Sequence, residues 1–407
     1  MANNVLPEEL MLCILTRLPV KTIVRFKSVC KPWHHLFSTP EFQKMHQGQF
    51  SSDPQNQSFI LHSFNKFSIF NSESGKKRPT ILDHPFAHDQ KIELDTVGCC
   101  NGLVCIRSDQ EIVLWNPAMK LSKTIPLKDC GPFKMVSLGF GYDAIGDDFK
   151  VVMIVANGVG EPLRSEIYSV NLGSWITIDV DFLFRLYQTK NDLIVNGNPY
   201  WVAWDEDDNL VLVCFDVLEL VFKIVPWPTN YWMSLNEVAG ADVDMDNLLV
   251  FEEETEIKTW AETERVEERV VELVDWNGAI GALMIKYKVE YSVDPLSPFT
   301  ECSVRIECVR VLVFDDIERI WKNDHTCGPI KVDVHRGIYC SKNGKVMGTL
   351  SSGTLFLSDL ETGCVEELFD GACFGSSFEV YAYTESLAYI NGMEKVVVIY
   401  EGIELDD

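Results

Sequence analysis

The sequence lacks the long apolar run that a membrane span needs. No stretch of about 18 or more apolar residues occurs in it, the length at which a transmembrane helix becomes plausible. No basic segment precedes a plain apolar core at the N-terminus, and Glu8, Glu9 and Arg17 closely bracket the apolar residues 11–15. We therefore expect neither a signal peptide nor a membrane span, and we expect the protein in the cytoplasm, the nucleus or both.

Patterns for disulfide bonds and metal sites are also missing. The chain has 13 cysteines, an odd number, and none of them forms a Cys-x-x-Cys pair. His84 and His88 are four residues apart, but Pro85 would break the helix that such a zinc pair needs. The acidic run Asp205–Asp208 lacks the Gly and the terminal Glu of a calcium loop. We expect free thiols in a reducing compartment and no metal or cofactor.

No motif suggests an enzyme. Gly139, Gly141 and Gly146 have the spacing G-x-G-x₄-G, but they lie between predicted strands with no following helix to receive a phosphate. Nothing in the sequence places a nucleophile beside a base. We therefore predict no catalytic residues, and an enzyme is the least favoured of the functions considered.

Basic residues are scarce outside the first 50 positions. The chain has 35 Lys and Arg against 61 Asp and Glu, a net charge of −26. Residues 1–50 hold six basic and three acidic groups, which leaves −29 for the remainder. This acidity disfavours nucleic acid and favours a basic partner through electrostatic steering. The plainer alternative is that the acidity only aids solubility.

Residues 6–42 predict three short helices with more apolar surface than they can bury. Pro7 suits a first helical turn, and Leu10, Ile14 and Leu18 recur on one face, while apolar residues 11–13 and 15 fill most of the remaining circumference. Pro19 ends this helix. We expect a second helix from about Val20 to Cys30 and a third from Pro32. Helices this short bury too little surface for two complete shells, so a second protein must cover the remaining face.

The order LPxxL, IL, RLPVK and VRFKSVCKPW in this segment resembles the F-box motif. The resemblance implies docking onto the Skp-type adaptor of a cullin-based ubiquitin ligase, and a basic F-box suits an acidic adaptor. A three-helix cap without a partner is the alternative. The adaptor-binding residues that the resemblance implies are Leu6, Pro7, Leu10, Ile14, Leu15, Leu18, Pro19, Val29, Cys30, Trp33 and Leu36.

The rest of the chain predicts strands at a regular period. A polar linker is expected over 49–58, and short apolar runs alternate with turn signals from Phe59 onward. Asn-Gly pairs, a strong hairpin signal, begin at positions 101, 196, 343 and 391. Their separations are close to multiples of about 48 residues, which fits a kelch-like β-propeller of about six to eight blades. We expect Phe59–Phe70 to pair near Glu394–Tyr400 where the first and last blades meet.

Several phrases also resemble the F-box-associated domain of plant F-box proteins. They are GCCNGLVCI from Gly98, LGFGYDAIGDDFKVV from Leu138 and VNGNPYWVA from Val195. The resemblance is strongest to the S-locus F-box and S-locus-F-box-like branch, from which the chain departs between about Phe251 and Cys327. The expected fold is thus an α+β multidomain chain, with a three-helix F-box over 1–48, a linker over 49–58 and an all-β propeller over 59–407.

Loops of the propeller are the candidate substrate surface. The phrase PWPTNYW is rich in interface anchors, and two acidic loops could contact a basic partner, although blade packing and solvated turns are the plainer alternatives. The candidate residues are Trp227, Tyr231, Trp232, Asp205, Asp207, Glu252, Glu253 and Glu254.

The resemblance implies a non-catalytic substrate receptor of an SCF (Skp–cullin–F-box) ubiquitin ligase. One version recognises a basic secreted ribonuclease in self-incompatibility, as the S-locus branch implies. A second regulates a stress or defence protein in the cytosol. A third is an F-box scaffold that never joins a cullin.

Overall fold

The computed structural model divides into two compact units. The first contains the helices and both ends of the chain, and the second consists of residues 180–189 and 198–377. The residues that the structure describes are 7–53, 56–63, 66–71, 79–86, 92–131, 134–156, 163–180, 184–186, 193–228, 264–276, 278–293, 300–327, 330–340, 345–350, 354–360, 362–370 and 379–396.

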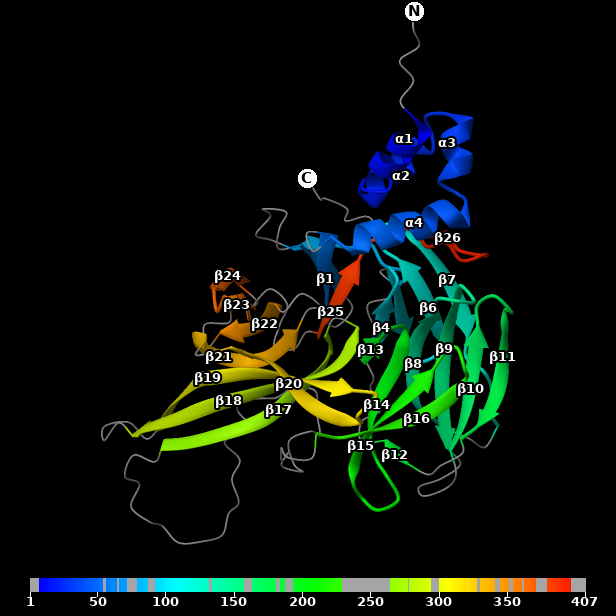
Figure 1. Ribbon diagram of the computed structural model, residues 1–407. Coiled ribbons are helices and arrows are strands. Elements are labelled where there is room, and N and C mark those ends of the chain that lie inside the picture. Colours follow the sequence, from blue (N-terminus) through cyan, green and yellow to red (C-terminus); the bar gives the residue numbers. More distant parts are fainter. Residues whose placement is uncertain are drawn as a thin grey trace, which may run out of the picture. The chain divides into compact units, whose positions relative to one another are not determined.

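Four helices open the first unit, one more than the sequence predicts. They are α1 (Glu8–Leu15), α2 (Val20–Phe26), α3 (Lys31–Leu36) and α4 (Pro40–Ser51). The second helix ends at Phe26, short of the predicted Cys30. The Thr39 side chain caps α4 by accepting the N–H of Phe42 at 3.3 Å, and Pro40 stands at its first position. Figure 1 shows α4 between the other helices and the strands of this unit.

Helix α4 also shortens the predicted linker. The helix continues to Ser51, and the first strand begins at Gln57. Both ends of the predicted stretch 49–58 therefore belong to regular structure. The linker prediction was too long because the sequence analysis overlooked the Thr39-Pro40 start signal.

The helices share one apolar core. Leu15, Val20, Ile23, Phe37 and Phe42 are buried in it. Ring centroids of Phe37 and Phe42 lie 5.0 Å apart, which suits a tilted aromatic pair. Leu387 from the C-terminal part of this unit is buried in the same cluster, and the half-buried Ala118 and Met119 pack against it. The β-rich part of the chain thus covers one side of the helices.

Three antiparallel sheets complete the first unit. Neighbouring strands are named here in sheet order. Sheet A contains β25 (Glu379–Thr384), β1 (Gln57–Ser63), β2 (Lys66–Phe70) and β3 (Thr80–Ile81). Sheet B contains β26 (Glu394–Lys395), β7 (Leu121–Pro126), β6 (Glu111–Asn116), β5 (Leu103–Arg107) and β4 (Asp95–Cys100). Sheet C contains β11 (Ser174–Asp179), β10 (Leu163–Ser169), β9 (Asp148–Ala156) and β8 (Lys134–Asp143).

The described strands of the second unit form three further antiparallel sheets. Sheet D contains β12 (Arg185–Leu186), β14 (Asn198–Trp204), β15 (Leu210–Asp216) and β16 (Val221–Pro226). Sheet E contains β17 (Glu264–Trp276), β18 (Ala279–Val293), β19 (Thr300–Asp315) and β20 (Ile320–Cys327). Sheet F contains β21 (Ile330–Cys340), β22 (Lys345–Leu350), β23 (Thr354–Asp359) and β24 (Val365–Asp370). A short pairing of β19 with β21 joins sheets E and F.

The first strand does pair with the C-terminal region, but not where the sequence predicts. Strand β1 pairs with β25, and Phe59 lies opposite Ala382. Glu394 and Lys395 pair instead with Ser122 and Leu121 of sheet B. The prediction that Phe59–Phe70 pairs near Glu394–Tyr400 was therefore wrong. Strand β25 has buried side chains that suit a sheet interior, whereas both residues of β26 are exposed.

One turn recurs in five of the described sheets, and we call it the apex turn. It starts at an Asp, Asn or Ser that ends a strand, and it closes four residues later at a residue with φ between 55° and 67°. In sheets D and E, the N–H of the closing residue donates to the carbonyl of the first at 2.8 Å. The first and closing residues in sheets B to F are Asn116 and Lys120, Ser169 and Gly173, Asp216 and Leu220, Asp315 and Arg319, and Asp359 and Gly363.

Three of the four predicted Asn-Gly turns lie within the described residues. Asn101 and Asn196 have φ values of 47° and 51°, and the glycines that follow them have φ of 76° and 80°. Positive φ at both central residues is what a two-residue type I′ hairpin requires. The pair at Asn391 is also a turn, while the pair at Asn343 lies outside the described residues.

Candidate adaptor-binding surface

Helix α1 carries large apolar side chains on two opposite sides. Leu15 is 3% exposed in the helical core, whereas Leu10 and Ile14 are 54% and 51% exposed. Leu10 and Ile14 are one helical turn apart, so they are neighbours on one face. The burial of Leu15 shows that the helix has already formed a core on its other side. The exposed pair is therefore surplus to the packing of this chain.

Residues of α2 and of the segment after it add to the exposed apolar surface. Val29 is 63% exposed and Val24 is 37% exposed. Pro7, Pro19 and Cys30 are exposed as well. We call Leu10, Ile14, Val24 and Val29 the exposed helical face.

The predicted adaptor anchors differ in how far they are exposed. Pro7, Leu10, Ile14, Pro19, Val29 and Cys30 are exposed and accessible to a partner. Leu18, Trp33 and Leu36 are half-buried against the helical core, and Leu6 lies outside the described residues. Leu15 is buried in that core, which contradicts its prediction as a contact residue. The periodicity of α1 could not separate buried Leu15 from exposed Leu10 and Ile14, because both faces of this helix are apolar.

Sequence reasoning missed Val24 as a member of this surface. The sequence gives no signal for it, because Val24 is four residues after the buried Val20 and periodicity places the two on one side of α2. Exposed basic side chains surround the apolar ones, namely Arg17, Lys21, Arg25 and Lys31. Burial lowers the pKa of Lys27. An apolar surface with a basic rim fits a partner that is itself acidic at its edge.

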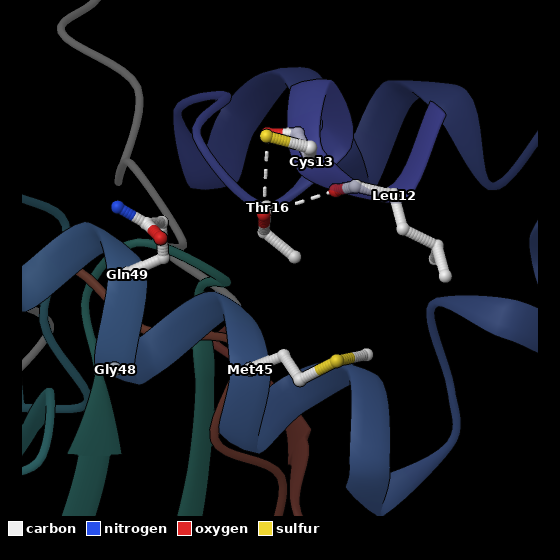
Figure 2. Close-up of a pocket in the computed structure, with 6 residues that line it drawn as sticks. All are labelled: Leu12, Cys13, Thr16, Met45, Gly48 and Gln49. Atoms are coloured by element: carbon white, nitrogen blue, oxygen red, sulfur yellow. Dashed lines mark hydrogen bonds between the residues drawn. The ribbon is translucent and has the colours of Figure 1, made fainter. Parts of the chain in front are cut away.

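A shallow pocket of about 340 Å³ lies between α1 and α4. Figure 2 shows Leu12 and Met45 directed toward the space between the two helices. Thr16 donates its hydroxyl to the Leu12 carbonyl at 2.9 Å, so its polar group is already used within α1. Among the described lining residues, Cys13 is the single ionisable side chain. The lining therefore offers apolar contact and no paired groups for acid–base chemistry.

Comparison with known proteins identifies the fold family. The F-box associated beta propeller domain matches residues 33–317, more than half of the chain, and the F-box domain matches residues 4–45. The chain belongs to the F-box associated beta propeller domain family. It carries an F-box, and its relatives make it an F-box protein of the plant type. The expected fold of helices followed by a propeller of six to eight blades is confirmed, with sheets A–F as six blades.

Relatives from Arabidopsis thaliana share just over a quarter of their aligned residues with this chain. F-box protein At3g16210 is 27% identical over 57% of this chain and 64% of its own length. F-box/kelch-repeat protein At3g23880 is 28% identical over 58% of this chain and 70% of its own. The chain thus spans less than two thirds of the first of these relatives. A Bacteroides caccae protein of the DUF4784 family matches 81% of this chain and 74% of its own at 10% identity and a TM-score of 0.34, too low to support an argument.

F-box proteins as a class are substrate receptors of SCF ligases, and the F-box generally binds the Skp-type adaptor and through it cullin. Members of these families are non-catalytic substrate adaptors. Within the described residues, no cluster of three His, Cys, Asp or Glu side chains could hold a metal ion. None of the described helices is long and apolar enough to cross a membrane.

The predicted substrate-binding residues of this F-box protein differ in burial and in their hydrogen bonds. Trp227 is only 6% exposed, which does not fit an exposed interface anchor. Asp205 accepts the N–H of Asn209 at 2.8 Å and of Asp207 at 3.0 Å, so it closes a hairpin turn. These hydrogen bonds, led by the one from Asn209, lower the pKa of Asp205. Asp207 is exposed, and the predicted residues outside the described part are Tyr231, Trp232, Glu252, Glu253 and Glu254.

Proposed function

We propose that this F-box protein is the substrate-recognition subunit of an SCF ubiquitin ligase. The observation that carries the proposal is the exposed helical face, in which Leu10, Ile14 and Val29 are more than half exposed although the helices already have a core. The Skp-type adaptor would cover this face, and the propeller would hold a protein substrate. Ubiquitin transfer would then gain from proximity, with no acid or base supplied by this chain.

Burial of this face supplies part of the free energy of docking. Complete burial of a Leu, Ile or Val side chain is worth about 1.5–3 kcal/mol. About half of that remains to be gained for each of Leu10, Ile14 and Val29, on the order of 1 kcal/mol per side chain. The proline and half-buried anchors add contact area. Association costs offset part of the sum, so a few side chains decide whether the adaptor binds.

Substitution of one exposed side chain tests the docking. Leu10→Arg places a charge on the exposed helical face, and Leu6→Ala with Pro7→Ala removes two predicted anchors that precede α1 in the sequence. Both variants should lose adaptor capture while the far-ultraviolet circular dichroism of the sheets is unchanged. Leu172→Arg is the matched control, because Leu172 is 68% exposed in the apex turn of sheet C. Unaltered capture by Leu10→Arg would refute the assignment. Capture of the adaptor without cullin would favour the scaffold alternative.

For the substrate, we propose a basic protein. The support is the charge of −29 outside the first 50 residues, which attracts a basic partner and repels an acidic one. A basic secreted ribonuclease, as in S-locus recognition, is the substrate that the sequence resemblance favours. Its binding should weaken steeply between low and high salt. A stress or defence substrate held by apolar loops should instead bind with little salt dependence.

A further inference from the structure

We infer that the apex turns of sheets D and E together form a docking surface for a basic amphipathic helix of a partner protein. The inference deepens the proposed function, since it rests on this chain acting as a receptor for a protein substrate. We call the surface the D/E turn surface. Its apolar members are Leu218, Val221, Ile317 and Ile320.

The D/E turn surface exposes aliphatic side chains at its tips. Ile317 is 93% exposed and Leu218 is 50% exposed, with Ile320 and Val221 at 47% and 38% beside them. Single exposed aliphatic residues are ordinary on a protein surface, but a cluster of them indicates a binding site. Leu218 and Ile317 occupy the same position of the apex turn, two residues after Asp216 and Asp315 respectively.

Hydrogen bonds join the turn of sheet E to the last strand of sheet D. Arg319, which closes the turn of sheet E, donates to the Ile224 carbonyl of sheet D at 2.8 Å. Trp321 Nε1 donates to the Pro226 carbonyl of the same strand at 2.8 Å. Burial raises the pKa of Tyr200 in sheet D, and the charges of both Asp216 and Asp316 raise it further. Val221 follows the turn of sheet D and lies three residues, about 10 Å, along β16 from Ile224, a separation that one helix can span.

Both turns are held rigidly. Asp315 Oδ1 accepts the N–H groups of Ile317 and Glu318, each at 2.9 Å. Lys322 pairs with Asp315 at 2.6 Å and with Glu318 at 3.0 Å. In sheet D the same bonds recur, since Asp216 Oδ1 accepts the N–H groups of residues 218 and 219, and Lys223 pairs with Asp216 at 2.7 Å and with Glu219 at 2.9 Å. A preformed surface loses little conformational entropy when it binds.

In sheet B, the apex turn packs against helices of the same chain. In that sheet Asn116 begins the turn, so Ala118 stands at the position of Leu218 and Ile317. Ala118 and the next residue, Met119, are half-buried against the cluster built by the F-box helices. The chain thus already uses one apex turn to pack against helices. The corresponding tips in sheets D and E carry larger apolar side chains and are exposed.

The net charge of the D/E turn surface determines which kind of partner helix it attracts. Five carboxylates and three cations leave the D/E turn surface with a net charge of −2, from Asp216, Glu219, Asp315, Asp316 and Glu318 against Lys223, Arg319 and Lys322. A second copy of this chain would bring the same negative charge and would be repelled. A helix with an apolar stripe and lysine or arginine flanks would instead be attracted.

The test uses the full chain and two helical peptides of about 18 residues, whose Leu stripe has a spacing of three and four residues. One peptide carries Lys on its flanks and the other Glu, and fluorescence anisotropy measures their binding. The variant Leu218→Asp with Ile317→Asp adds negative charge, so pure charge attraction would bind the Lys peptide more tightly. Our inference expects binding at least about tenfold weaker, because the apolar contact is lost. The Glu peptide should bind wild type at least about tenfold more weakly than the Lys peptide.

Ile145→Asp with Leu172→Asp is the matched control, because both residues are exposed apolar tips of sheet C. It should bind the Lys peptide as wild type does. Equal or tighter binding by the Leu218→Asp/Ile317→Asp variant, or equal loss in the control, would overturn the inference. So would a wild-type dimer in sedimentation that this variant dissociates, since the occupant would then be a second copy. Adaptor capture by the variant should equal that of wild type, so failure here is distinguishable from failure of the docking proposal.

Discussion

The helices and the sheets of the first unit differ in how completely they bury their apolar side chains. In sheet C, Val151, Val152, Ile154 and Val155 of β9 are all completely buried. In α1, Leu10 and Ile14 are half exposed although Leu15, the residue after Ile14, is buried. Both regions have enough apolar residues to form a core. The difference shows that β9 buries its apolar residues within this chain, whereas α1 leaves two of its apolar residues exposed, which is the basis of the docking proposal.

The largest effect on stability is expected from the charged interior of sheet C. Lys150 is buried and lies 3.1 Å from Asp143 and 3.4 Å from Asp148. Burial alone would raise the pKa of Asp143, but the N–H of Gly146 and the ammonium of Lys150 hold it below its ordinary value. Lys150→Met would leave two buried carboxylates without their cation. We expect a loss of about 3–5 kcal/mol in the free energy of unfolding, measured by urea denaturation.

Low pH should relieve that loss in the Lys150→Met variant. A carboxylate whose folded pKa is depressed stabilises the fold above its unfolded pKa, and this contribution disappears as the pH falls through the folded value. Wild type should therefore lose stability on acidification, whereas the variant, with Asp143 no longer held by Lys150, should lose less. Lys123→Met is a control in a neighbouring sheet, since Lys123 is only half-buried and donates to the Asn391 carbonyl. An equal loss in both variants would contradict a special role for the buried cation.

The two faces of α1 should respond differently to truncation. Leu15→Ala opens a cavity in the helical core, and we expect it to cost about 2–5 kcal/mol of unfolding free energy. Leu10→Ala removes a half-exposed side chain, and we expect a change within about 0.5 kcal/mol. Adaptor affinity should show the reverse difference among molecules that remain folded. Equal destabilisation by the two substitutions would break the comparison, because it would place Leu10 in a core.

The smallest effect concerns the pH dependence of the helical core. His46 is fully buried, its Nε2 lies 2.8 Å from the Leu18 carbonyl, and its ring stacks on Phe50 at 5.1 Å. Burial lowers the pKa of His46 below its ordinary 6.5, and the hydrogen bond to Leu18 only partly opposes this. Its Nδ1 has no hydrogen-bond partner among the described residues. The neutral ring is therefore the form that the fold accepts.

A histidine with a depressed folded pKa binds a proton more readily when unfolded. Its contribution to stability is thus complete above the unfolded pKa and is lost as the pH falls below about 6.5. Thermal unfolding of the wild type should show a lower midpoint at about pH 5.5 than at about pH 7.5. His46→Gln keeps a donor for the Leu18 carbonyl but cannot titrate, so its midpoint should depend less on pH. An identical pH dependence in the two proteins would exclude His46 as the source.

Sequence reasoning reached the fold because its signals are local. Asn101 and Asn196 predicted hairpins, and their positive φ values follow from the Asn-Gly pair itself. The recurring apex turn also has a local signal at its start, which is an Asp or Asn in sheets B, D, E and F, although its closing residue varies. These features depend on neighbours along the chain, and they survive without knowledge of the tertiary structure.

The failures concern choices that only tertiary packing makes. Periodicity marked Leu10, Ile14 and Leu15 alike as apolar, and it could not say which face of α1 meets the core. Trp227 read as an exposed anchor, but it is buried in the structure. The strand partner of β1 was placed too close to the C-terminus, because Glu379–Thr384 has no turn signature that distinguishes it. The D/E turn surface was missed for the same reason, since β16 and β20 are far apart in sequence.

Hydrogen–deuterium exchange of the full chain, with and without a purified Skp-type adaptor, tests most directly whether an outside subunit covers the exposed helical face. The account predicts that the adaptor slows exchange in peptides covering α1 and the segment from α2 to α3, and leaves the strands of sheet C unchanged. Exchange in α1 that is equally slow with and without the adaptor would contradict it, because the face would then be covered by the chain itself.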